Sequence, residues 1–160
     1  MLVKWGFITL TVAGVVGLVV GGALRDSCGT TTADRDAPGD LRDEAALAER
    51  LAALDAALAS QNLSRAVYEW RDAYGLALRA RGWEAMAAVG DAAVRVDSVM
   101  GGPAGRSTGF RAEARRAYIH ALLRAQREQS REGVNHIADG FTSLGDTDMA
   151  AGARILGTMR

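Results

Sequence analysis

The sequence predicts an all-α protein, with an N-terminal transmembrane helix followed by an antiparallel bundle of five or six helices. Three observations support this fold class. Residues 5–24 form an unbroken run of uncharged, mostly apolar residues. Beyond that run β-branched residues are scarce, a composition that favours helices over strands. The chain has only two prolines, Pro38 and Pro103, and each lies next to a glycine where a break between helices is expected.

The apolar run is long enough to cross a lipid bilayer. A helix rises about 1.5 Å per residue, so the run would span about 30 Å, the thickness of the hydrocarbon core. We therefore expect residues 1–24 to be a retained membrane anchor. The alternative is a cleavable signal peptide, which would use Lys4 as its basic start and Gly21 and Ala23 as the small residues before the cleavage site. The run is longer than the usual signal core of about 7–15 residues, which favours the anchor.

Cys28, the only cysteine, follows the apolar run and suggests a lipoprotein. The three residues before it are Arg25, Asp26 and Ser27, and two of them are charged where a lipoprotein signal needs small or apolar residues. We therefore reject lipid attachment at Cys28 by that route. A single cysteine also excludes an internal disulfide and a cysteine-based zinc site.

The basic N-terminus favours an orientation with the C-terminal domain outside the cytoplasm. Lys4 and the amino group form a basic tip, and such a tip usually stays in the cytoplasm. Arg25, Arg35 and Arg42, on the other side of the anchor, favour the opposite orientation. Lys4 is the only lysine in the chain, a usage that indicates a GC-rich genome. We expect a single-pass protein of a bacterial inner membrane.

Small residues recur every four positions along the predicted anchor and would line one face of its helix: Thr9, Ala13, Gly17 and Gly21. Small side chains let two helices approach closely in lipid, so this face is a candidate for homodimerisation through the anchor. The alternative is that small residues are simply common in transmembrane helices.

Residues 25–40 are expected to form a flexible linker, because they combine glycine, three consecutive threonines and the break around Pro38 with few apolar residues. Residues 41–160 are enough for one domain. Six helical segments are expected there: from Asp40 to near residue 60, then about 63–81, about 83–99, from Ser107 or Thr108 to near residue 129, from Ser130 to Gly145, and a short one after Asp146.

Each expected helix carries apolar residues at helical spacing, which predicts one buried face per helix. The faces consist of Leu47, Leu51, Leu54 and Leu58; Val67, Trp70, Tyr74 and Leu78; Met86, Ala93 and Val94; Phe110, Ala114, Tyr118, Ala121, Leu122 and Ala125; Val134, Ile137, Phe141 and Leu144; and Met149, Ala153 and Leu156. The aromatic residues of these stripes, and Trp83, are expected to build the core. Most connections are short, so neighbouring helices should be antiparallel.

The predicted helical domain contains an internal repeat. Residues 71–78 and 115–122 share the pattern R-x-A-Y-x-x-A-L at an offset of 44 residues. Residues 84–91 correspond to residues 132–139 at an offset of 48 residues. A repeated helix pair is typical of an α-solenoid.

The stretch from Val134 to Leu156 resembles a tetratricopeptide repeat. Phe141 takes the aromatic position of the first helix, Gly145 and Asp146 take the turn, and Ala150 takes the small crossing position of the second helix. A weaker echo comes from Tyr74, Gly82 and Ala87. The family's tryptophan, Leu-Gly and final proline are missing, and the observed repeat is longer than the usual 34 residues or so. The resemblance implies a helical scaffold that binds peptides or proteins.

No local motif predicts catalysis, and no cofactor or metal is expected. The glycine-rich segment 101–108 is similar to a phosphate-binding loop, but Met100 stands where the first glycine belongs and Arg106 replaces the lysine. We interpret it as a linker between helices. His120 and His136 are the only histidines and lack a zinc-binding spacing. An active site assembled around them from distant residues remains an alternative.

Arginine is concentrated in the fourth helix and the turn after it, with seven arginines and two glutamates between residues 106 and 131. The residues whose spacing places them on one outer face are Arg116, Arg124, Arg127 and Arg131. Such a face is a candidate site for anionic lipid head groups, another polyanion or an acidic partner. The alternative is a solvated face, partly neutralised by the acidic first helix. Over the whole chain 19 basic residues balance 19 acidic ones, so nucleic-acid binding is not expected.

These observations predict a membrane-anchored scaffold for protein–protein interaction rather than an enzyme. The helical repeat would present its surface to a protein partner near the membrane. Binding of anionic lipid or a polyanion through the fourth helix, an enzyme with a site around His120 or His136, and self-association through the anchor are the alternative hypotheses.

Overall fold

The computed structural model describes residues 38–101 and 108–158, and all of its regular structure is helical. The elements are α1 (Pro38–Ala59), α2 (Leu63–Arg79), α3 (Trp83–Gly101), α4 (Phe110–Arg127), α5 (Arg131–Ser143) and α6 (Thr147–Thr158). The predicted all-α class is therefore confirmed for this part of the chain, with six helices and no strand in it. The predicted anchor and most of the linker lie outside the described residues.

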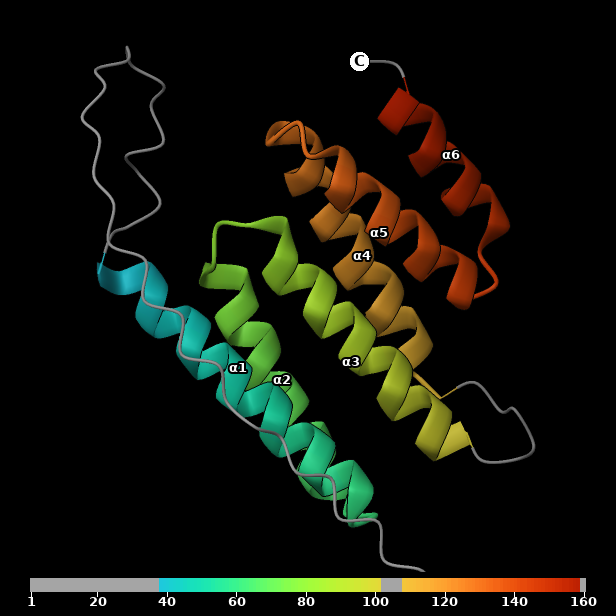
Figure 1. Cartoon of the computed structure of the whole chain (residues 1–160). Coiled ribbons are helices and arrows are strands. Elements are labelled where there is room, and N and C mark those ends of the chain that lie inside the picture. The colour runs from blue at the N-terminus through green and yellow to red at the C-terminus, as the bar shows by residue number, and fades with distance from the viewer. Residues whose placement is uncertain (1–37, 102–107, 159–160) are drawn as a thin grey trace, which may run out of the picture. The chain divides into compact units, whose positions relative to one another are not determined.

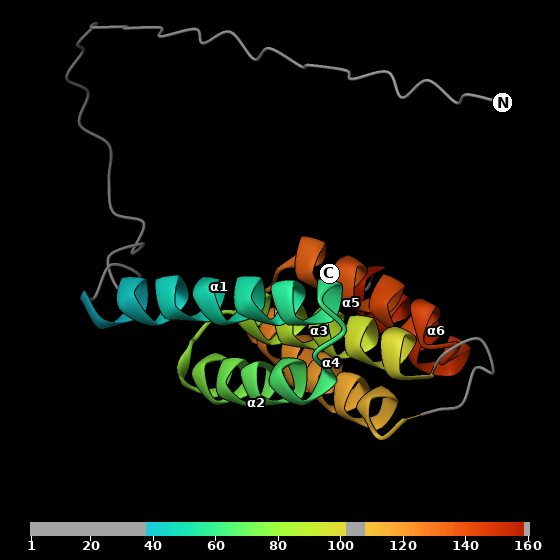
Figure 2. The same cartoon turned by 90° about the horizontal axis from the view of Figure 1, so that it is seen from below.

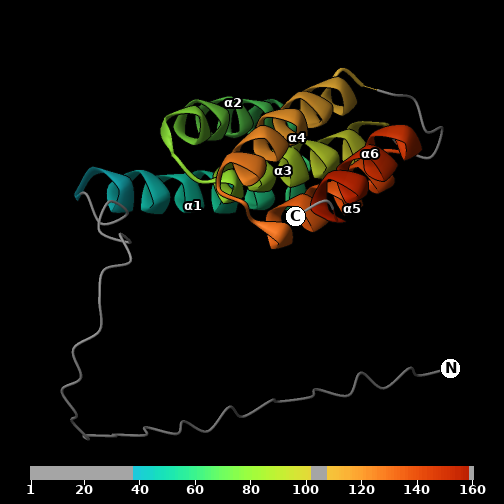
Figure 3. The same cartoon turned by 90° about the horizontal axis from the view of Figure 1, so that it is seen from above.

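The six helices form three consecutive antiparallel hairpins, α1–α2, α3–α4 and α5–α6, which follow one another across the domain (Figure 1). α3 is the central helix, because it packs against α1, α2, α4 and α5. α2 and α4 lie on one side of it, and α1 and α5 lie toward the other (Figures 2 and 3). The two segments of the internal repeat, residues 71–78 and 115–122, fall on α2 and α4, which share one side of the central helix.

Local chemistry explains where the helices begin and end. The side chain of Asn62 accepts a hydrogen bond from the backbone N–H of Arg65 (3.1 Å) and caps α2, and Ser130 caps α5 by accepting from Gly133 (3.0 Å). Gln61 and Gln129, one residue before each cap, both have φ of 57°. The turn between α5 and α6 uses Gly145 at φ 74°, a left-handed conformation that suits glycine.

The first helix begins at Pro38, inside the segment predicted as a linker. Proline fits the first turn of a helix because its missing N–H has no partner there and its fixed φ matches the helix. The helix thus begins two residues before Asp40, its expected start.

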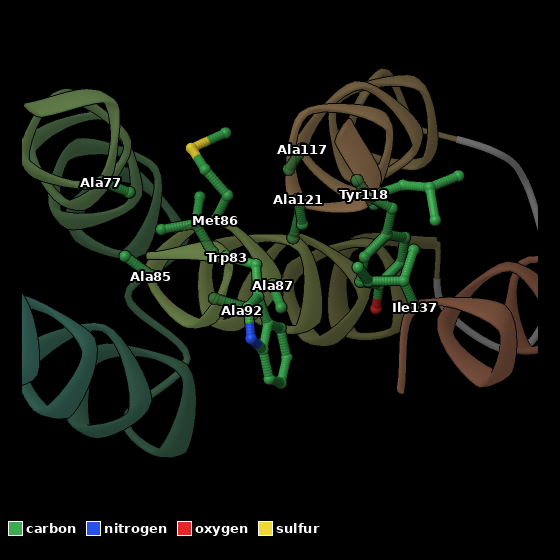
Figure 4. Close-up of a cluster of buried hydrophobic side chains, with 14 of the residues drawn as sticks. Ala77, Trp83, Ala85, Met86, Ala87, Ala92, Ala117, Tyr118, Ala121 and Ile137 are labelled. Carbon is green, nitrogen blue, oxygen red and sulfur yellow. The ribbon is translucent and has the colours of Figure 1, made fainter. Parts of the chain in front are cut away.

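About half of the buried core residues between the hairpins are alanines, and larger aliphatic and aromatic side chains make up the rest (Figure 4). Small residues let α3 and α4 approach closely, and Tyr118 fills the space that remains beside them. A Cβ atom built on Gly90 would lie 2.7 Å from the ring of Tyr118, and one built on Gly140 would lie 2.6 Å from it. The ring of Tyr118 therefore occupies a slot that α3 and α5 form with these two glycines.

The buried faces agree with the predicted stripes at most positions. Trp70, Trp83, Tyr118 and Phe141 are buried, and Tyr74 is partly buried. Leu78 and Leu156 are exceptions, since 48% and 46% of their surfaces are exposed. Both lie near the C-terminal end of their helix.

Candidate functional site

A groove of about 960 Å³ opens on the side of α3 that faces α1 and α5. Its walls come from four segments: the middle of α1, the turn between α2 and α3, the first turns of α3, and the turn between α4 and α5 with the start of α5. We call it the Trp83 groove. Its volume lies at the upper end of the range of about 300–1,000 Å³ that is usual for binding pockets.

The floor of the Trp83 groove is apolar. Leu47 and Leu51 contribute from α1, and Trp83, Ala85 and Ala88 contribute from α3. Trp83 also packs against α5, because a Cβ atom on Gly133 would lie 2.7 Å from the indole ring. Figure 4 shows that Trp83 and Met86 leave α3 on opposite sides. The indole is thus fixed between two helices while one part of it lines the groove.

The rim of the groove is acidic. Four glutamates line it, Glu44 from α1, Glu84 from α3, Glu128 from the end of α4 and Glu132 from α5, and all four are exposed. Among the described residues that line the groove, Arg81 is the only arginine. The groove therefore combines an apolar floor with an excess of negative charge at its edge.

Arg124 supports the wall of the groove from behind. Its guanidinium donates hydrogen bonds to the backbone carbonyls of Ala77 (2.9 Å), Leu78 (3.2 Å), Ala80 (2.8 Å) and Gly82 (3.0 Å). The last backbone carbonyls of a helix have no hydrogen-bond donor within the helix, so Arg124 supplies donors to the carbonyls at the end of α2 and in the turn that follows. Partial burial lowers the pKa of Arg124, an effect that the neighbouring Glu128 opposes.

The other arginines of the predicted anionic-ligand site have different surroundings. Arg116 pairs with Glu113 on its own helix at 2.9 Å, and Arg127 and Arg131 are exposed. Arg124 uses its donors on backbone carbonyls, as described above. The four residues are thus one structural arginine and three surface arginines, a distinction that helical spacing alone does not reveal.

The two histidines also differ from each other. His120 is exposed on α4, and His136 on α5 lies with its Nε2 atom 3.2 Å from Asp91 of α3. The hydroxyl of Tyr118 donates a hydrogen bond to the other oxygen of Asp91 at 2.7 Å. The sequence did not indicate Asp91 as a partner of His136, because the two residues are 45 positions apart. In the described part of the chain no three metal-binding side chains come together.

A buried carboxylate that we did not predict joins the first hairpin. Glu69 on α2 is completely buried, and its Oε2 atom lies 3.2 Å from Arg50 of α1. Arg65, one turn earlier on α2, pairs with its other oxygen. A buried charge is tolerated when it is paired, so this cluster fixes α1 against α2 rather than forming an open site.

Two predicted features fall outside the part of the chain that the structure describes. The dimerisation candidates Thr9, Ala13, Gly17 and Gly21 and the centre of the glycine-rich segment, residues 102–107, lie outside the described residues. At the end of that segment, Thr108 binds Asp97 through its backbone N–H (3.1 Å) and its hydroxyl (2.6 Å).

Within residues 38–101 and 108–158, none of the helices has the length and apolar character that a membrane crossing requires. Comparison of the chain with protein-family models, curated proteins and solved structures finds no match.

Proposed function

We propose that this chain is a membrane-tethered scaffold whose helical domain binds a segment of a partner protein in the Trp83 groove. The observation that supports this proposal is the groove itself: four separate segments converge on a concave surface with a mostly apolar floor. A concave, mostly apolar site with a polar rim is typical of a binding site for another molecule. The apolar run at residues 5–24 supports the tether.

The arrangement of the hairpins supports a tetratricopeptide-like scaffold. Odd-numbered helices pack against each other along the chain, α1 with α3 and α3 with α5, and each hairpin packs its second helix against the next hairpin. Ala150, proposed as the small crossing residue of the last hairpin, is 2% exposed. Stacked hairpins of this kind produce an extended surface on one side, which suits a binding function.

Site-specific photocrosslinking in cells tests this proposal. A photoreactive amino acid replaces Ala48, an exposed residue that lines the groove, or Ala112, an exposed residue of α4 that does not. We expect one defined protein to be captured from position 48 in the membrane fraction and not from position 112. Capture from both positions, or from neither, would contradict the use of this groove, and recovery of the chain from washed cells as a soluble species would contradict the tether.

A second candidate function, binding to anionic lipid, is favoured by the outer face of α4. Ile119 and Leu123 are 36% and 49% exposed there, on the same helix as the exposed Arg116 and Arg127. Apolar and basic side chains on one face are typical of helices that lie on anionic membranes. Binding to vesicles with and without phosphatidylglycerol tests it: wild-type protein should prefer the anionic vesicles, and the Arg116→Ala, Arg127→Ala double variant should lose that preference.

A further inference from the structure

The charge around the Trp83 groove indicates what kind of segment would occupy it. We propose that the groove binds a cationic, amphipathic segment of the partner protein, with lysine or arginine side chains toward the rim and a large apolar side chain on the floor. This inference rests on the proposed function and adds the chemistry of the partner.

The apolar part of the argument comes from the floor. Leu51 and Ala88 are partly exposed where they line the groove, beside Leu47 and Trp83, which are 6% and 8% exposed. An aliphatic or aromatic side chain placed against Leu51 and Ala88 would remove their exposed surface from water. Burial of a large apolar side chain in this way is a common source of affinity at protein interfaces.

The ionic part of the argument comes from the rim. The four glutamates that line the groove come from α1, from α3 and from the two ends of the α4–α5 turn. Arg81 lines the same groove, and Arg124 lies behind the turn with its donors on four carbonyls. Negative charge therefore prevails at the opening. An acidic segment would meet several like charges there, whereas a basic one would be attracted over a distance of about 8–10 Å.

The test uses full-length protein and three labelled synthetic peptides of 14 residues. The first is an amphipathic peptide of lysine and leucine, the second has glutamate in place of lysine, and the third has serine in place of leucine. Fluorescence anisotropy at low ionic strength measures binding. We expect the lysine–leucine peptide to bind, and the other two to bind at least tenfold more weakly.

Two double variants with the same change in net charge test whether the groove is the site. Glu44→Gln with Glu132→Gln removes two rim charges, and Glu49→Gln with Asp148→Asn removes two exposed charges that do not line the groove. We expect the rim variant to raise Kd at least fivefold and the control variant to change it by less than twofold. Circular dichroism at 222 nm shows whether both retain the wild-type helix content.

Equal weakening by the two variants would overturn the inference, because binding would then follow the overall charge and not the groove. Failure of the inference can be separated from failure of the proposed function. If a partner crosslinks at position 48 through an acidic or uncharged segment, the groove remains a docking site and only its proposed preference for cations is wrong.

Discussion

Replacing Arg124 should weaken the whole helical domain, even though the residue lies in a stretch that resembles a solvated basic face. In Arg124→Met the carbonyls of Ala77, Leu78, Ala80 and Gly82 lose their guanidinium donor. A charge-assisted hydrogen bond contributes about 1.5–3 kcal/mol when fully buried, but Arg124 is only partly buried and some of the carbonyls would gain water. Nη1 carries two hydrogens for three of these carbonyls, so three N–H groups serve the four acceptors. About 0.5–1 kcal/mol for each N–H group gives an expected loss of about 1.5–3 kcal/mol in the free energy of unfolding.

Arg127→Met is the matched control, because Arg127 also lies in the last turn of α4, carries the same charge and is exposed. Its loss should cost less than about 1 kcal/mol, the usual contribution of a cation near a helix C-terminus. Arg124→Lys should fall between the two, since an ammonium group cannot reach all four carbonyls. Urea unfolding of the full-length variants, followed at 222 nm in one non-ionic detergent, measures the difference. If Arg124→Met and Arg127→Met unfold within about 0.5 kcal/mol of each other, the structural role that we assign to Arg124 is wrong.

Three further outcomes are expected. Gly140→Ala should destabilise the fold by about 1–3 kcal/mol, because the added methyl group would overlap the confined ring of Tyr118. Gly152 has open space around its Cβ position, so Gly152→Ala should be neutral or slightly stabilising; thermal melts of the two variants measure the difference. Burial, together with the hydrogen bond and charge of Asp91, raises the pKa of Tyr118. The contribution of Tyr118 to the free energy of unfolding is therefore fully present below about pH 10 and falls above that pH by up to about 1.4 kcal/mol per pH unit. Between pH 9 and 11.5 the free energy of unfolding should decline less steeply in Tyr118→Phe than in the wild type, and equal slopes would contradict this. Asn62→Ala should cost about 1 kcal/mol through loss of the α2 cap, while Asn62→Asp, which keeps an acceptor oxygen, should retain most of the stability in urea titrations.

The helices could be predicted from sequence because their signals are local. Apolar periodicity and the turn at Gly145 each act within a few residues, and the structure has both where they were expected. The caps at Asn62 and Ser130 are equally local, although the sequence indicated only helix boundaries near them. The start of α1 lies two residues before Asp40, because Pro38 is compatible with both a break and a first helical turn.

The candidate site was much harder to predict because it depends on contacts between distant segments. The Trp83 groove joins residues from positions 44 to 132, and none of its walls contains a recognisable motif. Helical spacing grouped Arg124 with Arg127, although one binds backbone carbonyls and the other faces solvent. Their surroundings differ only because α4 packs behind the α2–α3 turn. The acidic rim could not be predicted either, because its glutamates are far apart in the sequence and only the fold brings them close together.

The double contact of Trp83 has a consequence for how the domain would respond to an occupant. The indole lines the groove with one part and rests against Gly133 of α5 with another. Any molecule that fixes the indole from the open side therefore also tightens the attachment of the final hairpin, which is the last unit of the stack. Occupancy of the groove would in this way reach the C-terminal hairpin through a single aromatic ring, and that hairpin would exchange its amide protons more slowly whenever the groove is filled.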